Sequence, residues 1–177
     1  MVITLIGYRG TGKSTVAEQL AARLNWEMVD SDDEIELRAG KSIQEIFAQD
    51  GEPHFRDLER GVLTELLHRD KIVVSAGGGA ILDDLTRHRM RQAGPVVWLQ
   101  ASVATIEQRI GSDPSSSSRR PALQGSDAQS EVATILAQRE PLYSDAATMF
   151  VLTDDRDVTA IVDEIVSQLP AEESHDS

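Results

Sequence analysis

The residues with the clearest chemical potential lie near the N-terminus, in the segment GYRGTGKST at positions 7–15. Positions 7–14 match G-x-x-x-x-G-K-[ST], the spacing of a phosphate-binding loop. Glycines at these positions let main-chain N–H groups turn towards an oxyanion, and a helix that begins there adds partial positive charge. Lys13 would reach the outer phosphates, and the hydroxyl of Ser14 would bind Mg²⁺. The segment therefore predicts a nucleoside triphosphate site.

Two carboxylates stand close together after the next apolar segment, in Asp30-Ser31-Asp32. Side chains at the carboxyl end of a strand in an α/β sheet face the crevice where ligands bind. One acid could hold a magnesium-bound water, and the other could accept a hydroxyl proton or orient that hydroxyl for in-line attack. A helix cap formed by Ser31 or Asp32 is the alternative. The nearby phosphate-binding loop favours phosphoryl transfer to a hydroxyl.

Glycines and arginines supply further candidates. Gly77, Gly78 and Gly79 follow a fully apolar run, and consecutive glycines indicate a close ligand or backbone, although a tight turn would also use them. Arg56 and Arg139 each adjoin acids, so either one alone is more simply explained by an ion pair on a solvated helix face. Motor and switch NTPases usually have a magnesium-binding aspartate at the end of a later apolar strand. The apolar run before Gly77 has no acid at its end, which argues against those classes.

The elements that position these residues follow from hydrophobic periodicity. Apolar runs predict short strands at 2–6, 26–29, 72–74, 96–99 and 149–152. Helices are predicted from 13 to about 24 and at 33–39, 43–49, 52–69, 82–92, 102–110, 128–140 and 157–169. Strands alternating with helices predict the α/β class, with a mainly parallel sheet covered on both faces and ligands at the carboxyl ends of its strands.

Composition and charge limit what this chain can do. Its 177 residues suit one domain, and 17 Lys+Arg against 30 Asp+Glu give a formal net charge of −13, which repels nucleic acids and anionic membranes. The first apolar run, at 2–6, is too short for a signal sequence or a membrane span. Cysteine is absent, which suits the cytoplasm. We expect neither a nucleic-acid nor a membrane partner.

Two segments fall outside the alternation of strands and helices. Residues 111–127 are rich in Gly, Ser, Asp and Pro and carry two adjacent arginines, which predicts a mobile loop. Residues 171–177 follow Pro170 and are small, polar and acidic, which predicts a disordered tail. The expected organisation is thus a single domain over 1–170.

Taken together and in order, six pieces of the chain resemble the shikimate kinases: GYRGTGKST, VDSD, GEPHFRDLE, AGGGA, RRP and REPLY. The resemblance covers nearly the whole chain. It implies that ATP, with Mg²⁺, phosphorylates the 3-hydroxyl of shikimate, a step towards chorismate and the aromatic amino acids. It also implies a three-layer α/β/α P-loop kinase fold, with a helical substrate-binding insertion at about 31–61 and a lid at about 111–127. ATP and shikimate would be the partners of a cytoplasmic monomer.

The resemblance also implies roles for individual residues. Asp32 would bind substrate hydroxyls and act as the base, Asp30 would join Ser14 near the magnesium, and Lys13 would neutralise the transferring phosphate. Arg56 and Arg139 would hold the substrate carboxylate, for which a guanidinium has the bidentate geometry. The backbone of the glycine run would contact the substrate, which adds Gly77, Gly78 and Gly79.

The remaining implied contacts are with ATP. Arg120 would come from the lid as a catalytic residue, closing over ATP and excluding water. Because Ser115–Ser118 lengthen this loop, Arg119 is the alternative, and Pro121 directly after Arg120 favours the latter. Arg109 and Arg156 would flank adenine, although Val158 stands where the family has a proline. The full set implied for ATP is Gly10, Thr11, Gly12, Lys13, Ser14, Thr15, Arg109, Arg120 and Arg156.

Two other functions remain open from the sequence. The first is another small-metabolite kinase of the same fold, acting on gluconate or a nucleoside monophosphate, and the combination of Arg56, Gly78 and Arg139 argues against it. The second is a non-catalytic nucleotide-binding regulator. Loss of Lys13, Asp32 or an arginine would favour a regulator, and all of them are present.

Overall fold

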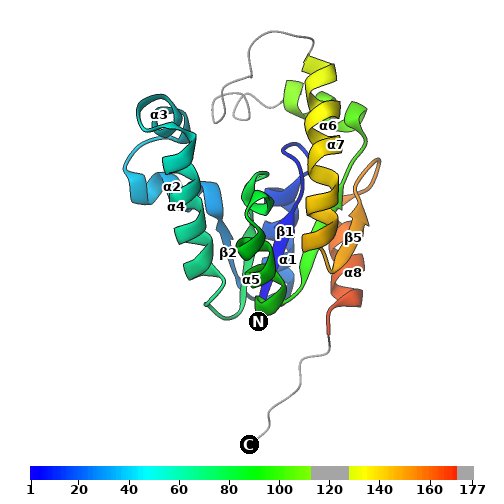
Figure 1. Ribbon diagram of the computed structural model, residues 1–177. Helices are drawn as coiled ribbons and strands as arrows, with labels where there is room; N and C mark the ends of the chain where they lie inside the picture. Colours follow the sequence, from blue (N-terminus) through cyan, green and yellow to red (C-terminus); the bar gives the residue numbers. More distant parts are fainter. Residues whose placement is uncertain (113–127, 171–177) are drawn as a thin grey trace, which may run out of the picture.

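A computed structural model of the protein describes residues 1–112 and 128–170. At its centre lies a five-stranded sheet in the order β2-β3-β1-β4-β5, in which every neighbouring pair of strands is parallel. The carboxyl ends of all five strands therefore meet at one edge (Figure 1). The predicted α/β class and parallel sheet are confirmed. The strands are β1 (Val2–Ile6), β2 (Glu27–Asp30), β3 (Ile72–Ser75), β4 (Val96–Gln100) and β5 (Met149–Leu152).

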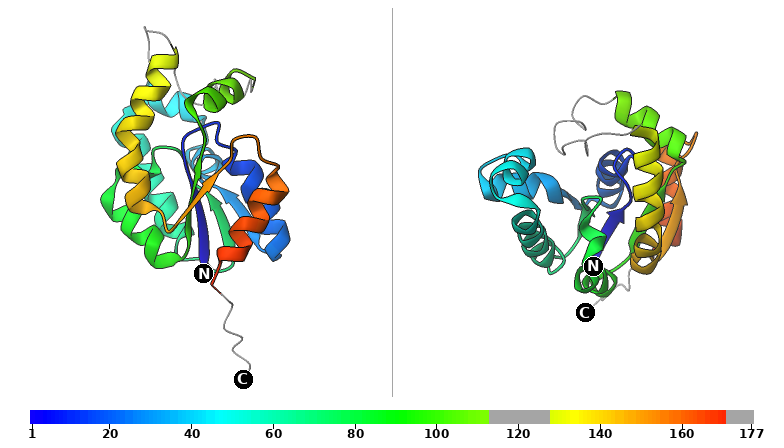
Figure 2. Two further views of the ribbon diagram at one scale, coloured as in Figure 1. Left: turned by 90° about the vertical axis from the view of Figure 1, so that its right-hand side faces the viewer. Right: turned by 45° about the horizontal axis from the view of Figure 1, so that its top comes forward.

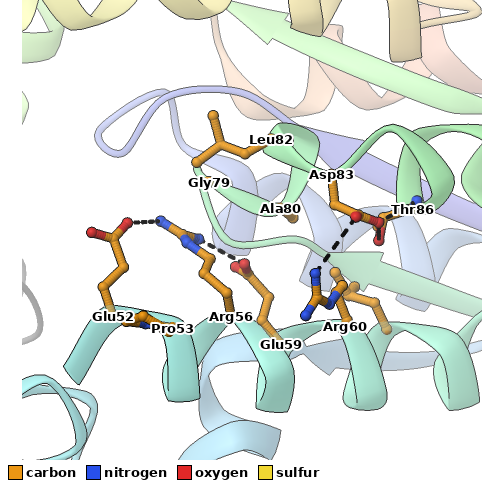
Figure 3. Close-up of a pocket in the computed structure, with 11 residues that line it drawn as sticks. Glu52, Pro53, Arg56, Glu59, Arg60, Gly79, Ala80, Leu82, Asp83 and Thr86 are labelled. Carbon is orange, nitrogen blue, oxygen red and sulfur yellow. Dashed lines mark hydrogen bonds and ion pairs between the residues drawn. The ribbon is translucent and has the colours of Figure 1, made fainter. Parts of the chain in front are cut away.

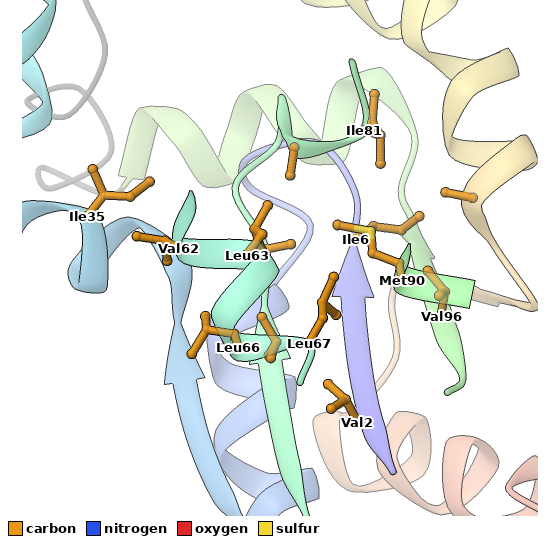
Figure 4. Close-up of a cluster of buried hydrophobic side chains, with 14 of the residues drawn as sticks. Val2, Ile6, Ile35, Val62, Leu63, Leu66, Leu67, Ile81, Met90 and Val96 are labelled. Atoms are coloured by element: carbon orange, nitrogen blue, oxygen red, sulfur yellow. The ribbon is translucent and has the colours of Figure 1, made fainter. Parts of the chain in front are cut away.

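Side chains that alternate along β1 supply two hydrophobic cores, one on each face of the sheet. Ile3 and Leu5 belong to the core covered by α1 (Lys13–Leu24) and α8 (Val158–Gln168). Val2 and Ile6 belong to the opposite core, where Figure 4 shows them beside side chains of α4 and α5. Because both faces of the central strand are buried, β1 reads as a continuous apolar run rather than as an alternating pattern.

The second face carries more helices than the first. It is covered by α4 (Gly51–Leu66), the short 3₁₀ helix η1 (Ala80–Leu82), α5 (Asp84–Ala93) and α7 (Ala128–Ala146). The helix α6 (Val103–Ser112) follows β4 at the edge where the strands end (Figure 2). Tyr8, Ile106 and Val132 form a small separate cluster that joins the loop after β1 to α6 and α7.

The chain between β2 and β3 folds into three successive helices to one side of the sheet (Figures 1 and 2). They are α2 (Ser31–Ala39), α3 (Ile43–Gln49) and α4. Their ends follow from local chemistry: Gly40 ends α2 in the left-handed conformation at φ 67°, and Ser42 and Glu45 form a capping box at the start of α3. Buried Ile35, Ile43 and Ile46 attach these helices to the core.

Several predicted boundaries were wrong. The helix predicted at 128–140 continues as α7 to Ala146 with Pro141 inside it, because the following turn is held by buried Tyr143 and Ala146. The helix predicted at 82–92 is η1 followed by α5, and the helix predicted from residue 33 begins at Ser31. Residues 111 and 112, which were predicted to belong to the loop, are part of α6.

Some predictions lie outside the described residues. They concern residues 113–127, with Arg119, Arg120 and the serine-rich part of the lid, and the tail at 171–177. Among the helices that the structure describes, none is both long and apolar enough to cross a membrane.

Candidate active site

The loop between β1 and α1 has the geometry of a phosphate cradle. Gly12 caps α1 in the left-handed region at φ 88°, and Gly10 lies in the same region at φ 81°. The hydroxyl of buried Thr11 donates to the carbonyl of Tyr8 at 2.8 Å and stiffens the loop. Lys13 Nζ donates to the carbonyls of Gly7 at 2.9 Å and Tyr8 at 3.1 Å, so the ammonium folds over its own loop. A bound phosphate would be surrounded by main-chain donors, the helix N-terminus and this ammonium.

Ser14 and Asp30, which lie far apart in the sequence, meet beside this loop. The Ser14 hydroxyl donates to Asp30 Oδ2 at 3.0 Å and lies 3.5 Å from the hydroxyl of Ser75, the last residue of β3. The other carboxylate oxygen of Asp30 caps α2 by accepting from the amides of Asp32 at 2.9 Å and Asp33 at 3.4 Å. Hydroxyl and carboxylate oxygens are hard ligands that suit Mg²⁺, which keeps most of its waters.

Asp32 lies in the first turn of α2, directly after the strand that ends at Asp30. Its side chain is partly buried, and its Oδ1 atom is shielded from solvent. The helix cap that the sequence left as an alternative is real, but Asp30 makes it, not Ser31 or Asp32. The carboxylate of Asp32 is therefore not used as the helix cap.

The segment Gly77–Gly79, the glycine turn, links three parts of the site. The Gly77 amide donates to the hydroxyl of fully buried Ser31 at 2.9 Å. A Cβ placed on Gly78 would lie 3.5 Å from the Gly7 carbonyl, so the turn also packs against the phosphate-binding loop. The Gly78 carbonyl accepts from Arg139 Nη1 at 3.2 Å and from the hydroxyl of Tyr143 at 2.7 Å. The turn thus connects the phosphate-binding loop with α2 and α7.

Arg56 on α4 reaches the same turn from the opposite side. A Cβ on Gly79 would come within 2.5 Å of Arg56 Nη1, so the guanidinium would have to shift if any other residue stood there. The guanidinium is held between two acids: buried Glu59, with Nη1 to Oε2 at 2.6 Å, and exposed Glu52, with Nη2 to Oε1 at 3.4 Å (Figure 3). The two arginines thus each contact one of two consecutive glycines.

A cavity of about 400 Å³ opens beside Arg56, between α4 and η1 (Figure 3). Its far wall includes Asp83, which caps α5 by accepting from the amide of Thr86 at 2.8 Å and from its hydroxyl at 2.6 Å. Burial acts to raise the pKa of the Asp83 carboxyl, but the hydrogen bonds from Thr86 and the charge of Arg60 outweigh burial and hold the pKa below its usual range.

The two arginines predicted beside adenine differ in their contacts. Arg109 joins the phosphate-binding loop to the segment after β5: its Nη1 donates to the Gly10 carbonyl at 3.4 Å, and its Nη2 donates to the Thr153 carbonyl at 3.1 Å. Arg156, which precedes α8 in the sequence, instead lies along that helix, with Nη1 2.6 Å from Glu164 Oε2. Arg109 therefore borders the cradle, whereas Arg156 is engaged by the helix that follows it.

The described residues of the predicted site are otherwise brought together at the carboxyl edge of the sheet. Thr15 lies exposed in the first turn of α1 beside Ser14. Sequence reasoning missed the contacts of Ser31 and Tyr143, which hold the glycine turn. The signal for Tyr143 was its place in REPLY, one helical turn after Arg139, and the signal for Ser31 was its place between two acids.

A phosphate-binding loop between β1 and α1, at the carboxyl edge of a parallel sheet with helices on both faces, is the arrangement of a P-loop kinase. The family model for shikimate kinase matches residues 9–170. A shikimate kinase of Rhodococcus erythropolis is 42% identical over 165 residues, covering 93% of this chain and 95% of the relative. The chain belongs to the shikimate kinase family.

Solved structures agree with this assignment. A shikimate kinase from Acinetobacter baumannii in complex with shikimate superposes with a TM-score of 0.87 at 36% identity, covering 94% of this chain and 90% of that one. A gluconokinase from Sinorhizobium meliloti, which covers 94% and 89%, gives a TM-score of 0.58 at 19% identity. That second likeness concerns the fold alone.

Proposed function

We propose that this protein transfers the terminal phosphoryl group of ATP to the 3-hydroxyl of shikimate, giving shikimate 3-phosphate for chorismate and aromatic amino acid synthesis. One observation carries the proposal: Arg56 and Arg139, from two helices, contact consecutive glycines in a turn that packs on the phosphate-binding loop. A carboxylate held by two guanidinium groups would fix the acceptor ring next to the outer phosphate. Membership of the shikimate kinase family supports the same acceptor.

The mechanism assigns each group a separate task. Asp32 orients the acceptor hydroxyl and accepts its proton as the bond to phosphorus forms. Lys13, whose ammonium is already folded over the loop, stabilises the negative charge on the transferring phosphoryl group. Backbone amides of the loop stabilise the phosphate oxygens. Arg109 borders the nucleotide from α6, and Arg120, outside the described residues, is proposed to close over ATP.

Mg²⁺ is the proposed companion of ATP. Ser14 and Asp30 would hold it, because their oxygens already meet at 3.0 Å beside the cradle. When bound, Mg²⁺ neutralises charge on the phosphates. We further propose a cytoplasmic monomer with its substrate-binding insertion at about 31–61 and a lid at about 111–127. The absence of cysteine supports the compartment.

The test is ADP release by purified protein with Mg²⁺-ATP and shikimate, with gluconate and AMP in parallel. We expect ADP with shikimate only. Release with gluconate or AMP alone would overturn the acceptor, and no release with any of the three would favour a nucleotide-binding regulator.

A matched pair of variants tests the arginine pair. Arg139→Lys keeps the charge but loses bidentate geometry, so we expect the KM for shikimate to rise about tenfold or more with the KM for ATP unchanged. Arg23→Lys, at an exposed position on α1, is the control and should behave as wild type.

A further inference from the structure

Side-chain packing around Tyr143 requires the aromatic ring but does not require its hydroxyl. The side chain is fully buried near the end of α7, and its ring stacks on Trp98 with centroids 5.5 Å apart. A phenylalanine ring would fill the same space and make the same stack. The hydroxyl donates a 2.7 Å hydrogen bond to the carbonyl of Gly78.

The Gly78 carbonyl is also where Arg139 rests. Arg139 Nη1 donates to it at 3.2 Å, from a position one helical turn before Tyr143 on α7. A carbonyl oxygen has two lone pairs and can accept both bonds at once. Because Gly78 is buried, its carbonyl would be left without a donor if Arg139 moved away and no second donor were present.

The proposed function requires Arg139 to turn towards a substrate carboxylate. A guanidinium that binds a carboxylate in the bidentate manner uses two of its five N–H groups, and a pair that includes the Nη1–H now directed at Gly78 must give up the bond to that carbonyl. Tyr143 removes the penalty of that exchange, since its hydroxyl keeps the carbonyl bonded. Ser31 holds the neighbouring Gly77 amide from the other side, so the turn itself stays in place.

We propose that Tyr143 is a positioning residue for the acceptor: its hydroxyl satisfies the Gly78 carbonyl and thereby lets Arg139 exchange that carbonyl for the substrate carboxylate. The inference rests on the proposed function, because it specifies how one of the two carboxylate-binding arginines is released. Tyr143 acts through Gly78 and Arg139, and α7 carries both side chains.

Tyr143→Phe tests this by removing one oxygen while keeping the ring. Shikimate binding is measured by calorimetry without ATP, followed by the KM values for shikimate and ATP. We expect shikimate binding to weaken about tenfold, as loss of a hydrogen bond to a buried carbonyl implies, with the KM for ATP unchanged. The control is Thr148→Val, whose hydroxyl also donates to a main-chain carbonyl, that of Val96 at 3.2 Å, at the opposite end of β4. The control should bind shikimate as wild type does.

The methyl ester of shikimate provides a second readout that a merely structural role would not move. The ester lacks the charge that Arg139 binds, so Tyr143→Phe should weaken ester binding by only about twofold. An equal loss for acid and ester would overturn the inference, because the tyrosine would then not act through Arg139. If the variant unfolds at 25 °C, the titrations are repeated for it and for wild type in about 1 M trimethylamine N-oxide, which favours the folded state.

The remaining outcomes separate the inference from the proposed function. The role of Tyr143 is overturned if Tyr143→Phe binds shikimate as tightly as Thr148→Val does. It is also overturned if Tyr143→Phe shifts the KM values for both substrates equally. Neither outcome contradicts the proposed activity. Wild-type protein that neither binds nor phosphorylates shikimate overturns the proposed function, and the inference with it.

Discussion

The phosphate-binding loop and the arginine pair lie against the same glycine turn, yet they are built in opposite ways. The loop is one continuous segment after β1, and its predicted donors are mainly backbone N–H groups fixed by the glycines and by the start of α1. The arginine pair comes from α4 and α7, two helices that lie far apart in the sequence. The first site is made by local conformation and the second by tertiary packing.

The cations of these two regions differ in the partners that they contact in the structure. Lys13 folds onto neutral carbonyls of its own loop, and Arg139 donates to another neutral carbonyl. Arg56 is paired with two carboxylates, one buried and one exposed. Under the proposed function, substrate binding by Arg56 would exchange one carboxylate partner for another, and its free energy would depend on Glu59 and Glu52. The predictions below separate changes at the acceptor site from changes at the nucleotide site.

Asp32→Asn should have the largest effect. The amide cannot accept the acceptor's proton, so kcat should fall about 10²–10⁴-fold, while the affinity for ATP stays as in wild type. Steady-state kinetics and calorimetric titration with ATP measure the two quantities. The smallest expected decrease in kcat is about 10²-fold, so a kcat within about threefold of wild type would show that Asp32 does not take part in the chemical step.

Gly79→Ala should disrupt the acceptor site without touching the nucleotide site. Its Cβ would stand 2.5 Å from Arg56 Nη1 and 2.7 Å from Nη2, so the guanidinium must move. We expect the KM for shikimate to rise about 10- to 100-fold, as for loss of one charged contact, and the KM for ATP to stay constant.

Gly61→Ala is the matched control for that substitution. Gly61 lies in the interior of α4, and nothing stands within 4 Å of its would-be Cβ. The helix should gain about 0.5–1 kcal/mol of stability with both KM values unchanged. If the two alanine variants shift the KM for shikimate alike, the steric argument at Gly79 is wrong.

Glu52→Gln should slightly strengthen shikimate binding at the acceptor site. Glu52 is the exposed partner of Arg56, with 62% of its side chain accessible, so it competes only weakly with a substrate carboxylate. Removing its charge should lower the KM for shikimate by about twofold at low ionic strength, and the difference should vanish near 1 M salt. A KM that rises instead would mean that Glu52 orients Arg56 rather than competes for it.

Asp83→Asn should have the smallest effect, on stability rather than on turnover. The native pKa of Asp83 lies below its usual value, so its charge stabilises the fold above about pH 4, and this stabilisation is lost as pH falls through the native pKa. Asparagine still caps α5, so we expect a loss of about 0.5–1 kcal/mol at pH 7 and a smaller loss near pH 2. Urea unfolding at both pH values measures this, and a difference independent of pH would contradict it.

Much of this architecture could be predicted from local patterns. All five strands were placed to within a residue at either end, because each contains a short apolar run whose side chains pack against the core on one or both faces of the sheet. The end of α7 could not be predicted in this way. Pro141 ordinarily stops a helix, and only the burial of Tyr143 and Ala146 against the core shows why the helix continues past it.

The sequence by itself determined the phosphate-binding loop, because that site needs only consecutive residues with the right backbone freedom between a strand and a helix. It also placed two acids where β2 ends, but it did not show which role each acid has. Only the tertiary structure showed that Asp30 caps α2 and meets Ser14, and that Arg56, Arg139 and Tyr143 converge on the glycine turn. Such contacts join residues far apart in the chain, so packing of helices on the sheet decides them, and no local pattern records which partner each side chain will find.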